Sequence, residues 1–214
     1  MTSSNAPRTV HLAVYDGLSD WETGHAVAHI NSPDYQRDPG RHVVRTVGPS
    51  TDIVTTAGGI RIMPDLPLAD LDPADSALLI LPGASGYMAG ELTEFIARAG
   101  AFLDEGVAVA AICGATVGLA QAGTLDDRAH TSNAPEALSW TGYAGAPHYL
   151  DVPAVTDRST AGHLITAAAM QPAAFAREIF LELDLYTPET LAAWFKLYGA
   201  GDPAGYHELM AATS

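Results

Sequence analysis

The chain has 214 residues, of which 48% are hydrophobic and 16% are charged, so it can bury one substantial core. Its formal net charge of -15, from 25 acidic and 10 basic residues, argues against a nucleic acid or an anionic membrane as a partner. A single cysteine cannot form an internal disulfide, which excludes a disulfide-stapled secreted scaffold and favours a reducing compartment.

The N-terminal residues contain no apolar signal-peptide core, and no apolar run approaches the length that spans a membrane. We therefore expect residues 1–8 to be a short flexible lead and residues 9–214 to form one domain. The expected location is the cytoplasm.

Apolar runs alternate with helical patterns through the first half of the chain. Residues 9–15 are predicted to be a buried strand, and a helix is expected from Asp20 to Ile30. The next predicted elements are strands at 43–47, 77–81 and 107–112, a hairpin of 53–56 with 60–63 around Gly58 and Gly59, and a helix over 92–102.

The second half continues with a helix after Cys113 that should end at Gly123. Strands alternating with helices predict a parallel sheet covered on both faces. The remaining predicted elements are strands at 128–132, 155–157 and 164–167, followed by helices at 173–185, 189–198 and 204–211.

The only cysteine, Cys113, lies between an apolar strand and a helix that is rich in small residues. A sharp strand-to-helix turn lifts a side chain out of the sheet and directs the helix N-terminus at it, which favours a thiolate. Gly114 permits such a turn, and Ala115 and Gly118 allow the helix to pack closely. The pattern indicates a reactive nucleophile, with a buried, inert cysteine as the alternative.

Three segments follow predicted parallel strands: residues 16–22, 82–87 and 113–116. They should converge on one edge of the sheet, where such folds bind ligands. In the second segment, glycine backbone N–H groups can line an oxyanion hole. In the first, Asp20 and Glu22 either serve the helix dipole or supply a protonated acid that stabilises the cysteine thiolate.

The three segments also carry a family pattern, in the order Tyr-Asp-Gly-Leu-Ser-Asp-Trp-Glu at 15–22, Leu-Ile-Leu-Pro-Gly at 79–83 and Ala-Ile-Cys-Gly-Ala at 111–115. Weaker similarity continues through residues 119–128 and 154–157. Over residues 9–183 the chain resembles the ThiJ/PfpI superfamily, which includes the parkinsonism-associated deglycase, peptidase-like proteins and isocyanide hydratase, and belongs with the class I glutamine-amidotransferase-like folds.

The resemblance implies a flavodoxin-like α/β sandwich, with a mostly parallel sheet and helices on both faces, and a homodimer that acts on a small molecule. It implies that Cys113 is the nucleophile and that Glu22 is the acid beside the sulfur, with Asp20 as the competing choice. The N–H groups of Gly83 and Gly114 are the implied oxyanion donors.

Two positions depart from the patterns of the similar families. Peptidase-like members place a histidine directly after the cysteine, where this chain has Gly114. Deglycase-like members place a histidine about twenty residues later, where this chain has Asn133. An asparagine can orient a ligand or donate a hydrogen bond, but it cannot act as a general base. His130 is nearby, although on a strand it would face away from Asn133.

Candidate substrate contacts and a candidate metal site remain. Glu22, His25 and His29 share one helix face and form the best candidate for metal ligands, but a fourth ligand is lacking, and polar helix positions or a dimer contact are preferred. We therefore expect no metal and no cofactor. The candidate substrate-binding residues are Asp20, Ala84, His130, Asn133 and His148.

The leading hypothesis is a cysteine-dependent hydrolase, hydratase or lyase in which Cys113 attacks a small electrophilic carbon. Protease and glutamine-amidotransferase activities are not expected. The rival hypothesis is a redox-sensing or stress-response protein in which Cys113 is oxidised. A third is a silent binding domain with an ordinary thiol.

Overall fold

The computed structural model describes residues 6–160 and 162–212 of the chain. In this part, seven strands form one sheet, in which only the edge pair β8·β9 is antiparallel. The order across the sheet is β5 (Leu66–Pro67), β2 (His42–Gly48), β1 (Arg8–Ala13), β6 (Ser76–Leu81), β7 (Ala108–Ile112), β9 (Leu164–Ala167) and β8 (Ala154–Asp157). The predicted α/β fold with a mostly parallel sheet is thus confirmed.

The centre of the core lies at β6 and β7. Leu78, Leu79, Ile80 and Leu81 of β6 are fully buried, as are the last four residues of β7. Strands with apolar side chains on both faces are expected where helices cover both faces of a parallel sheet. These two strands end at Leu81 and Ile112, directly before the segments that carry the family pattern.

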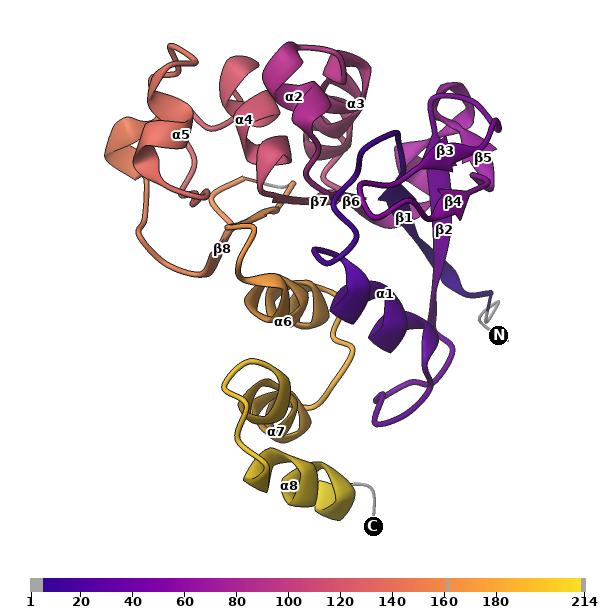
Figure 1. Ribbon diagram of the computed structural model, residues 1–214. Coiled ribbons are helices and arrows are strands. Elements are labelled where there is room, and N and C mark those ends of the chain that lie inside the picture. Colours follow the sequence, from indigo (N-terminus) through magenta and orange to yellow (C-terminus); the bar gives the residue numbers. More distant parts are fainter. Residues whose placement is uncertain (1–5, 161, 213–214) are drawn as a thin grey trace.

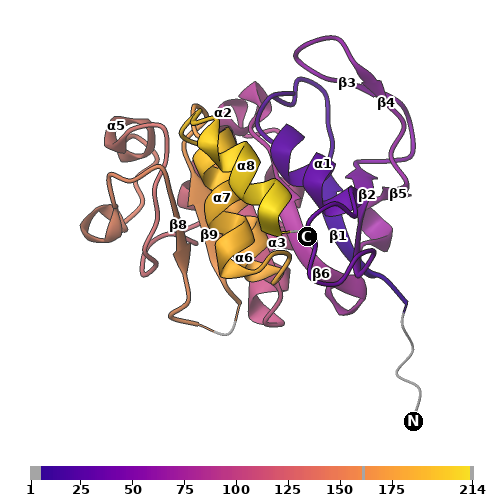
Figure 2. The same cartoon turned by 90° about the horizontal axis from the view of Figure 1, so that it is seen from below.

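Helices cover both faces of the sheet, as Figure 1 shows. On one face lie α2, α3 and α4, and on the other lie α1 and α6, which pack against each other. Helices α7 and α8 form a further layer outside α6, seen from below in Figure 2. Their bounds are α1 (Gly24–Asn31), α2 (Ser85–Ala89), α3 (Thr93–Asp104), α4 (Gly114–Gln121), α5 (Pro135–Ser139), α6 (Pro172–Glu182), α7 (Pro188–Tyr198) and α8 (Ala204–Ala212).

The predicted hairpin is present as β3 (Val54–Thr55) and β4 (Arg61–Ile62), which pair antiparallel outside the main sheet. The prediction of a strand at 128–132 was wrong: there, only His130 makes an isolated parallel bridge to Tyr149. The sequence also did not predict β5, α2, α5 and the short 3-10 turns η1 (Leu68–Asp70), η2 (Pro73–Asp75) and η3 (Ala146–His148).

The predicted flexible lead over residues 1–8 lies largely outside the described residues, and Arg8 already belongs to β1. Among the described helices, none combines the length and the hydropathy needed to cross a bilayer.

Candidate active site

Cys113 occupies a strained turn between β7 and α4. Its backbone has φ 59° and ψ -124°, a conformation that L-residues rarely adopt. The Cys113 N–H donates to the carbonyl of Ala167 on β9 at 3.1 Å, and the Thr116 hydroxyl donates to the Cys113 carbonyl at 2.6 Å. These bonds hold the backbone in the conformation that projects the thiol from the sheet edge.

Glu22 is fully buried beside the sulfur. Its Oε2 accepts a hydrogen bond from the Gly83 N–H at 2.5 Å. A Cβ at Gly83 would lie 2.7 Å from the Cys113 Cβ and 2.9 Å from Glu22 Oε2, so only glycine allows the two side chains to meet there. The Gly83 N–H is therefore engaged by Glu22 in this structure, and its role as an oxyanion donor stays a prediction.

Asp20 is directed elsewhere. Its Oδ2 accepts from the Gly58 N–H at 2.6 Å, and hydrogen bonding to the Thr56 side chain lowers the pKa of Asp20. Asp20 thus fastens the turn between β3 and β4 to the segment that precedes α1. Of the two carboxyl groups that the sequence left open, Glu22 is the one beside Cys113.

Asn133 also reaches the sulfur. Its Oδ1 accepts from the Ala169 N–H at 2.8 Å, which orients the amide so that Nδ2 faces Cys113 Sγ at 3.3 Å. The position twenty residues after the cysteine therefore does contact the thiol, as the family spacing implies. In this chain the contact is a hydrogen-bond donor without basicity.

Burial dominates the ionisation of both groups. It raises the pKa of the Cys113 thiol, against the hydrogen bond from Asn133, which lowers it. Burial also raises the pKa of Glu22, against the hydrogen bond from Gly83. The expected shift toward thiolate is therefore not found, because loss of hydration outweighs the donors around the sulfur.

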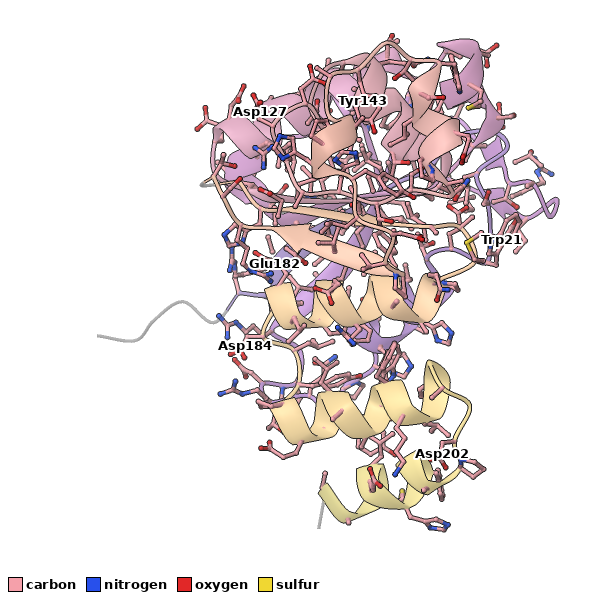
Figure 3. The ribbon with its side chains drawn as sticks, turned by 90° about the vertical axis from the view of Figure 1, so that its left-hand side faces the viewer. Trp21, Asp127, Tyr143, Glu182, Asp184 and Asp202 are labelled. Carbon is pink, nitrogen blue, oxygen red and sulfur yellow. The ribbon has the colours of Figure 1, made fainter. Side chains whose placement is uncertain are left out.

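His130 does not take the place of the family histidine. It is fully buried, its Nδ1 donates to the Arg128 carbonyl at 2.8 Å, and its Nε2 lies 3.3 Å from the Tyr143 hydroxyl. Tyr143 is well separated from Trp21, the neighbour of Glu22, in Figure 3. Both ring nitrogens of His130 are thus used in packing the loop around α5.

His148 is exposed, and only its backbone takes part in the fold: its carbonyl accepts from the His130 N–H at 3.2 Å. Neither of these two predicted substrate contacts is brought to the sulfur by a hydrogen bond. Among the described residues, the side chains that approach Cys113 through hydrogen bonding are Glu22 and Asn133.

Gly114 and Ala84 pack backbone to backbone at the start of α4. A Cβ at Gly114 would lie 2.7 Å from the Ala84 carbonyl oxygen, so a larger residue cannot be placed there without moving the chain. The histidine of peptidase-like members has no space at this position. The Gly114 N–H points at the Cys113 sulfur and favours its ionised form.

The three candidate metal ligands on the predicted first helix do not converge on one site in the structure. Glu22 faces Cys113, whereas His25 and His29 pack against Trp194 and Tyr198. The Trp194 N–H donates to His29 Nε2 at 3.1 Å, which leaves His29 as a neutral imidazole in an aromatic cluster. No group of three metal-ligating side chains occurs among the described residues.

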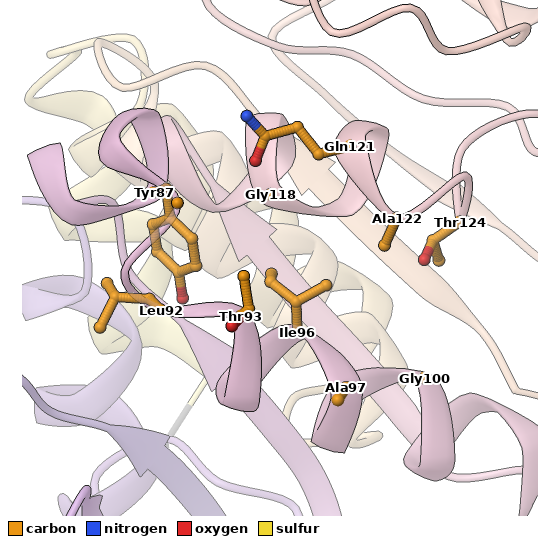
Figure 4. A pocket seen from close by; sticks show the side chains of 11 residues that line it. Tyr87, Leu92, Thr93, Ile96, Ala97, Gly100, Gly118, Gln121, Ala122 and Thr124 are labelled. Atoms are coloured by element: carbon orange, nitrogen blue, oxygen red, sulfur yellow. The ribbon is translucent and has the colours of Figure 1, made fainter.

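Two cavities flank the site. One of about 270 Å³ lies between residues 151–153 and residues 168–171, and Asn133 lines it. The other, of about 340 Å³, lies between α3 and α4 and is lined by Tyr87, Ile96 and Gln121, as Figure 4 shows. Neither cavity has Cys113 or Glu22 among its lining residues; the first adjoins the site only through Asn133, whose amide contacts the sulfur.

The sequence analysis did not identify Tyr15 and Tyr87 as part of the site. Both are buried, and their hydroxyls lie 2.9 Å apart. Tyr15 also donates to the Pro82 carbonyl, which belongs to the same peptide group as the Gly83 N–H. The available signal was the position of Tyr15 at the end of the predicted first strand, within the family-pattern segment that carries Glu22.

Comparison with known proteins identifies the family. Residues 8–182 match the model of the DJ-1/PfpI family. A Bacillus subtilis protein named uncharacterized protease YoaZ is 37% identical over 206 residues, which cover 95% of this chain and 96% of the relative.

Two solved structures are similar over nearly the whole chain. A ThiJ/PfpI family protein from Bacillus anthracis has a TM-score of 0.86 and 35% identity, covering 96% of this chain and 97% of the other. A DJ-1 superfamily protein from Agrobacterium tumefaciens has a TM-score of 0.78 and 31% identity, covering 90% and 98%. The chain belongs to the DJ-1/PfpI family.

Proposed function

We propose that this protein is a cysteine-dependent enzyme that hydrates or hydrolyses a small molecule with an electrophilic carbon. The observation that carries the proposal is the hydrogen-bonded pairing of a strained, partly exposed Cys113 with the buried carboxyl of Glu22. Positive φ at a strand-to-helix turn is retained where a nucleophile must project into a site. The cavity beside Asn133 offers space for a small substrate.

In the proposed reaction the thiol proton passes to Glu22 as Cys113 Sγ forms a bond to the electrophilic carbon. The negative charge that develops on the substrate is neutralised when Glu22 returns this proton. The Gly114 N–H, which points at the sulfur, would donate to the developing charge, because the Gly83 N–H is already bonded to Glu22. In a hydrolysis the leaving group departs with the proton that Glu22 returned. Water then attacks the same carbon: its oxygen bonds to the carbon, the carbon–Sγ bond breaks, and the proton that water loses passes through Glu22 to the sulfur, which restores the thiol.

A raised pKa suits Glu22 to this cycle. A carboxyl of ordinary pKa is almost fully ionised near neutral pH and holds no proton to donate, whereas the raised pKa of Glu22 brings it closer to the pH at which it can both accept and return a proton. No hydrogen bond joins an imidazole to Cys113 among the described residues. A substrate that needs little protonation of its leaving group is therefore favoured over a peptide.

The test is turnover of an aldehyde, an isocyanide, an amide and a peptide substrate by the wild type and by Cys113→Ala. We expect at least one of the first three to be turned over and Cys113→Ala to lose that turnover while keeping the wild-type circular dichroism. His207→Ala is the matched control, because this exposed side chain lies in α8, outside the candidate site. Turnover that survives in Cys113→Ala contradicts the proposal, and hydrolysis confined to the peptide redirects it to the protease activity named for the Bacillus subtilis relative.

A redox role is the second candidate. Glu22 Oε1 is buried without a hydrogen-bond partner, so a protonated carboxyl there has a free oxygen to bind an oxidised sulfur. Selective conversion of Cys113 to the sulfinic acid by mild peroxide, seen by mass spectrometry and without turnover of any panel substrate, favours this candidate.

A further inference from the structure

A continuous hydrogen-bond chain leads from α2 to the carboxyl beside the cysteine. The Tyr87 and Tyr15 hydroxyls are 2.9 Å apart, Tyr15 bonds the Pro82 carbonyl, and the Gly83 N–H donates to Glu22 Oε2 at 2.5 Å. Tyr15 and Tyr87 are each 1% exposed, so water does not compete for these bonds. The hydrogen bonds join two separate segments of the sequence, residues 15–22 and 82–87.

The direction of the chain follows from the donors and acceptors. A carbonyl oxygen can only accept, so the single Tyr15 hydroxyl hydrogen is used on Pro82. Tyr87 must therefore donate its hydrogen to the Tyr15 oxygen. Burial raises the pKa of both phenols, which keeps both hydrogens in place. Every donor thus points toward Glu22.

The Pro82–Gly83 peptide group couples the tyrosines to Glu22. A hydrogen bond accepted by the carbonyl of a peptide polarises its N–H and makes it a stronger donor. The Pro82 carbonyl receives the Tyr15 hydrogen while the Gly83 N–H of the same group holds Glu22 Oε2. Bonds on both sides also fix the plane of this peptide against the sulfur.

We propose that Tyr87 and Tyr15 are positioning residues that act through the Pro82–Gly83 peptide to hold the proton balance between Glu22 and Cys113. Neither phenol touches the sulfur, so neither is a catalytic residue. The proposal builds on the pairing of Glu22 with Cys113, but it concerns the ionisation of the thiol and needs no turnover.

The Tyr15 hydroxyl affects the ionisation of the Cys113 thiol through the charge on Glu22. A strong Gly83 donor stabilises the Glu22 carboxylate, and that negative charge raises the pKa of the neighbouring thiol. Among the described residues, Tyr15, Tyr87 and Cys113 are the titratable groups whose charges couple to Glu22. Removing the Tyr15 hydroxyl should therefore shift the shared proton toward Glu22 and leave more thiolate at neutral pH.

The experiment is the rate of iodoacetamide alkylation of Cys113, the only cysteine, measured against pH. We expect Tyr15→Phe to lower the pH midpoint of the alkylation rate by roughly 0.1–0.6 units and to speed alkylation at pH 7 by roughly 1.3- to 4-fold. Tyr87→Phe should act in the same direction but more weakly, because it is one bond further away. Both variants keep the ring packing of Tyr15 on Phe95 and Tyr87.

The hydrogen-bond chain from Tyr87 through Tyr15 and the Pro82–Gly83 peptide to Glu22 is called the relay below. Two control variants distinguish an effect of the relay from a general loosening of the core. Tyr186→Phe removes the hydroxyl of a buried tyrosine that bonds His29 outside the relay, and it should leave the pH midpoint unchanged. In a Glu22→Gln background, Tyr15→Phe should no longer alter the midpoint, because the carboxyl through which the relay acts is gone.

Equal midpoints for Tyr15→Phe and wild type, or the same Tyr15→Phe shift with and without Glu22, would overturn the proposal. Because alkylation does not require a substrate, this result is independent of the Cys113→Ala turnover test. Loss of the proposed enzyme activity alone would leave the relay standing.

Discussion

The sulfur of Cys113 lies among groups that change its pKa in opposite directions. Burial raises the pKa and the Glu22 charge adds to this, whereas the Asn133 amide and the Gly114 N–H lower it. Asn133 is the one side chain among these that donates to the sulfur, and it can be replaced without changing the backbone of the Cys113 turn. It is therefore the residue through which thiol reactivity can be adjusted.

Asn133→Ala removes the donor to Sγ, so we expect the pH midpoint of Cys113 alkylation to rise and the rate at pH 7 to fall roughly 2- to 10-fold. Asn133→Asp should lower the rate further, because it replaces the donor with a negative charge. Ser139→Ala, at an exposed position in α5, is the matched control. An unchanged midpoint in both Asn133 variants would show that the 3.3 Å contact contributes nothing to ionisation.

Individual site residues were predictable where a local pattern determines their place. Cys113 was predictable from the strand, turn and helix around it, and the spacing of twenty residues led to Asn133. The choice between Asp20 and Glu22 was not predictable, because it depends on the long-range contact of Asp20 with Gly58. The thiol pKa was predicted in the wrong direction, since sequence shows the helix terminus but not the extent of burial.

At the scale of elements, apolar periodicity predicted the strands and helices that form the core. The error at 128–132 has a local cause: the apolar and hydroxyl-bearing pattern resembles a strand, but His130 pairs only with Tyr149 and the chain otherwise bonds through side chains. Helices α2 and α5, five residues each, are too short for a helical period to be recognised.

The close packing of α4 on α3 depends on a glycine. A Cβ at Gly118 would lie 2.7 Å from Ile96 Cδ1 and 2.8 Å from Tyr87 Cδ1, whereas a Cβ at Gly100, within α3, meets nothing within 4 Å. Gly118→Ala should lower the free energy of unfolding by roughly 0.5–2 kcal/mol, because overpacking exceeds the gain in helix propensity. Gly100→Ala should raise it by roughly 0.5–1 kcal/mol.

Urea denaturation of the two variants provides the measurement, with the m-value as a check that the unfolded states are comparable. A stabilised Gly118→Ala would mean that Ile96 moves aside at no cost, and that the interface of α3 with α4 is looser than the contacts imply.

For the whole molecule, the net charge of -15 affects any assembly of two copies. The homodimer stays a prediction from the family resemblance. Two such chains repel each other at low ionic strength, so a dimer would have to overcome that repulsion through apolar contacts at its interface.

The stability of the whole chain should also fall in mild acid, and His42 offers a way to measure part of this effect. His42 on β2 is 4% exposed, and burial lowers its pKa to about 4. An unfolded histidine has a pKa near ~6.5, so between these values the unfolded state binds the proton and the folded state does not. The contribution of the neutral His42 to the free energy of unfolding is therefore fully present above pH 6.5 and is lost as the pH falls toward 4.

His42→Gln removes this proton uptake, so its free energy of unfolding should fall less steeply between pH 6.5 and 4, by up to ~1.4 kcal/mol per pH unit. His207→Gln, at an exposed position, should keep the wild-type slope. Acid also reduces the repulsion among the carboxylates, which acts in the opposite direction, but both variants retain every carboxylate and the comparison of slopes removes this contribution. Equal slopes for His42→Gln and wild type would place the acid sensitivity in other groups, with His29, whose pKa is also lowered to about 4, as the next to replace.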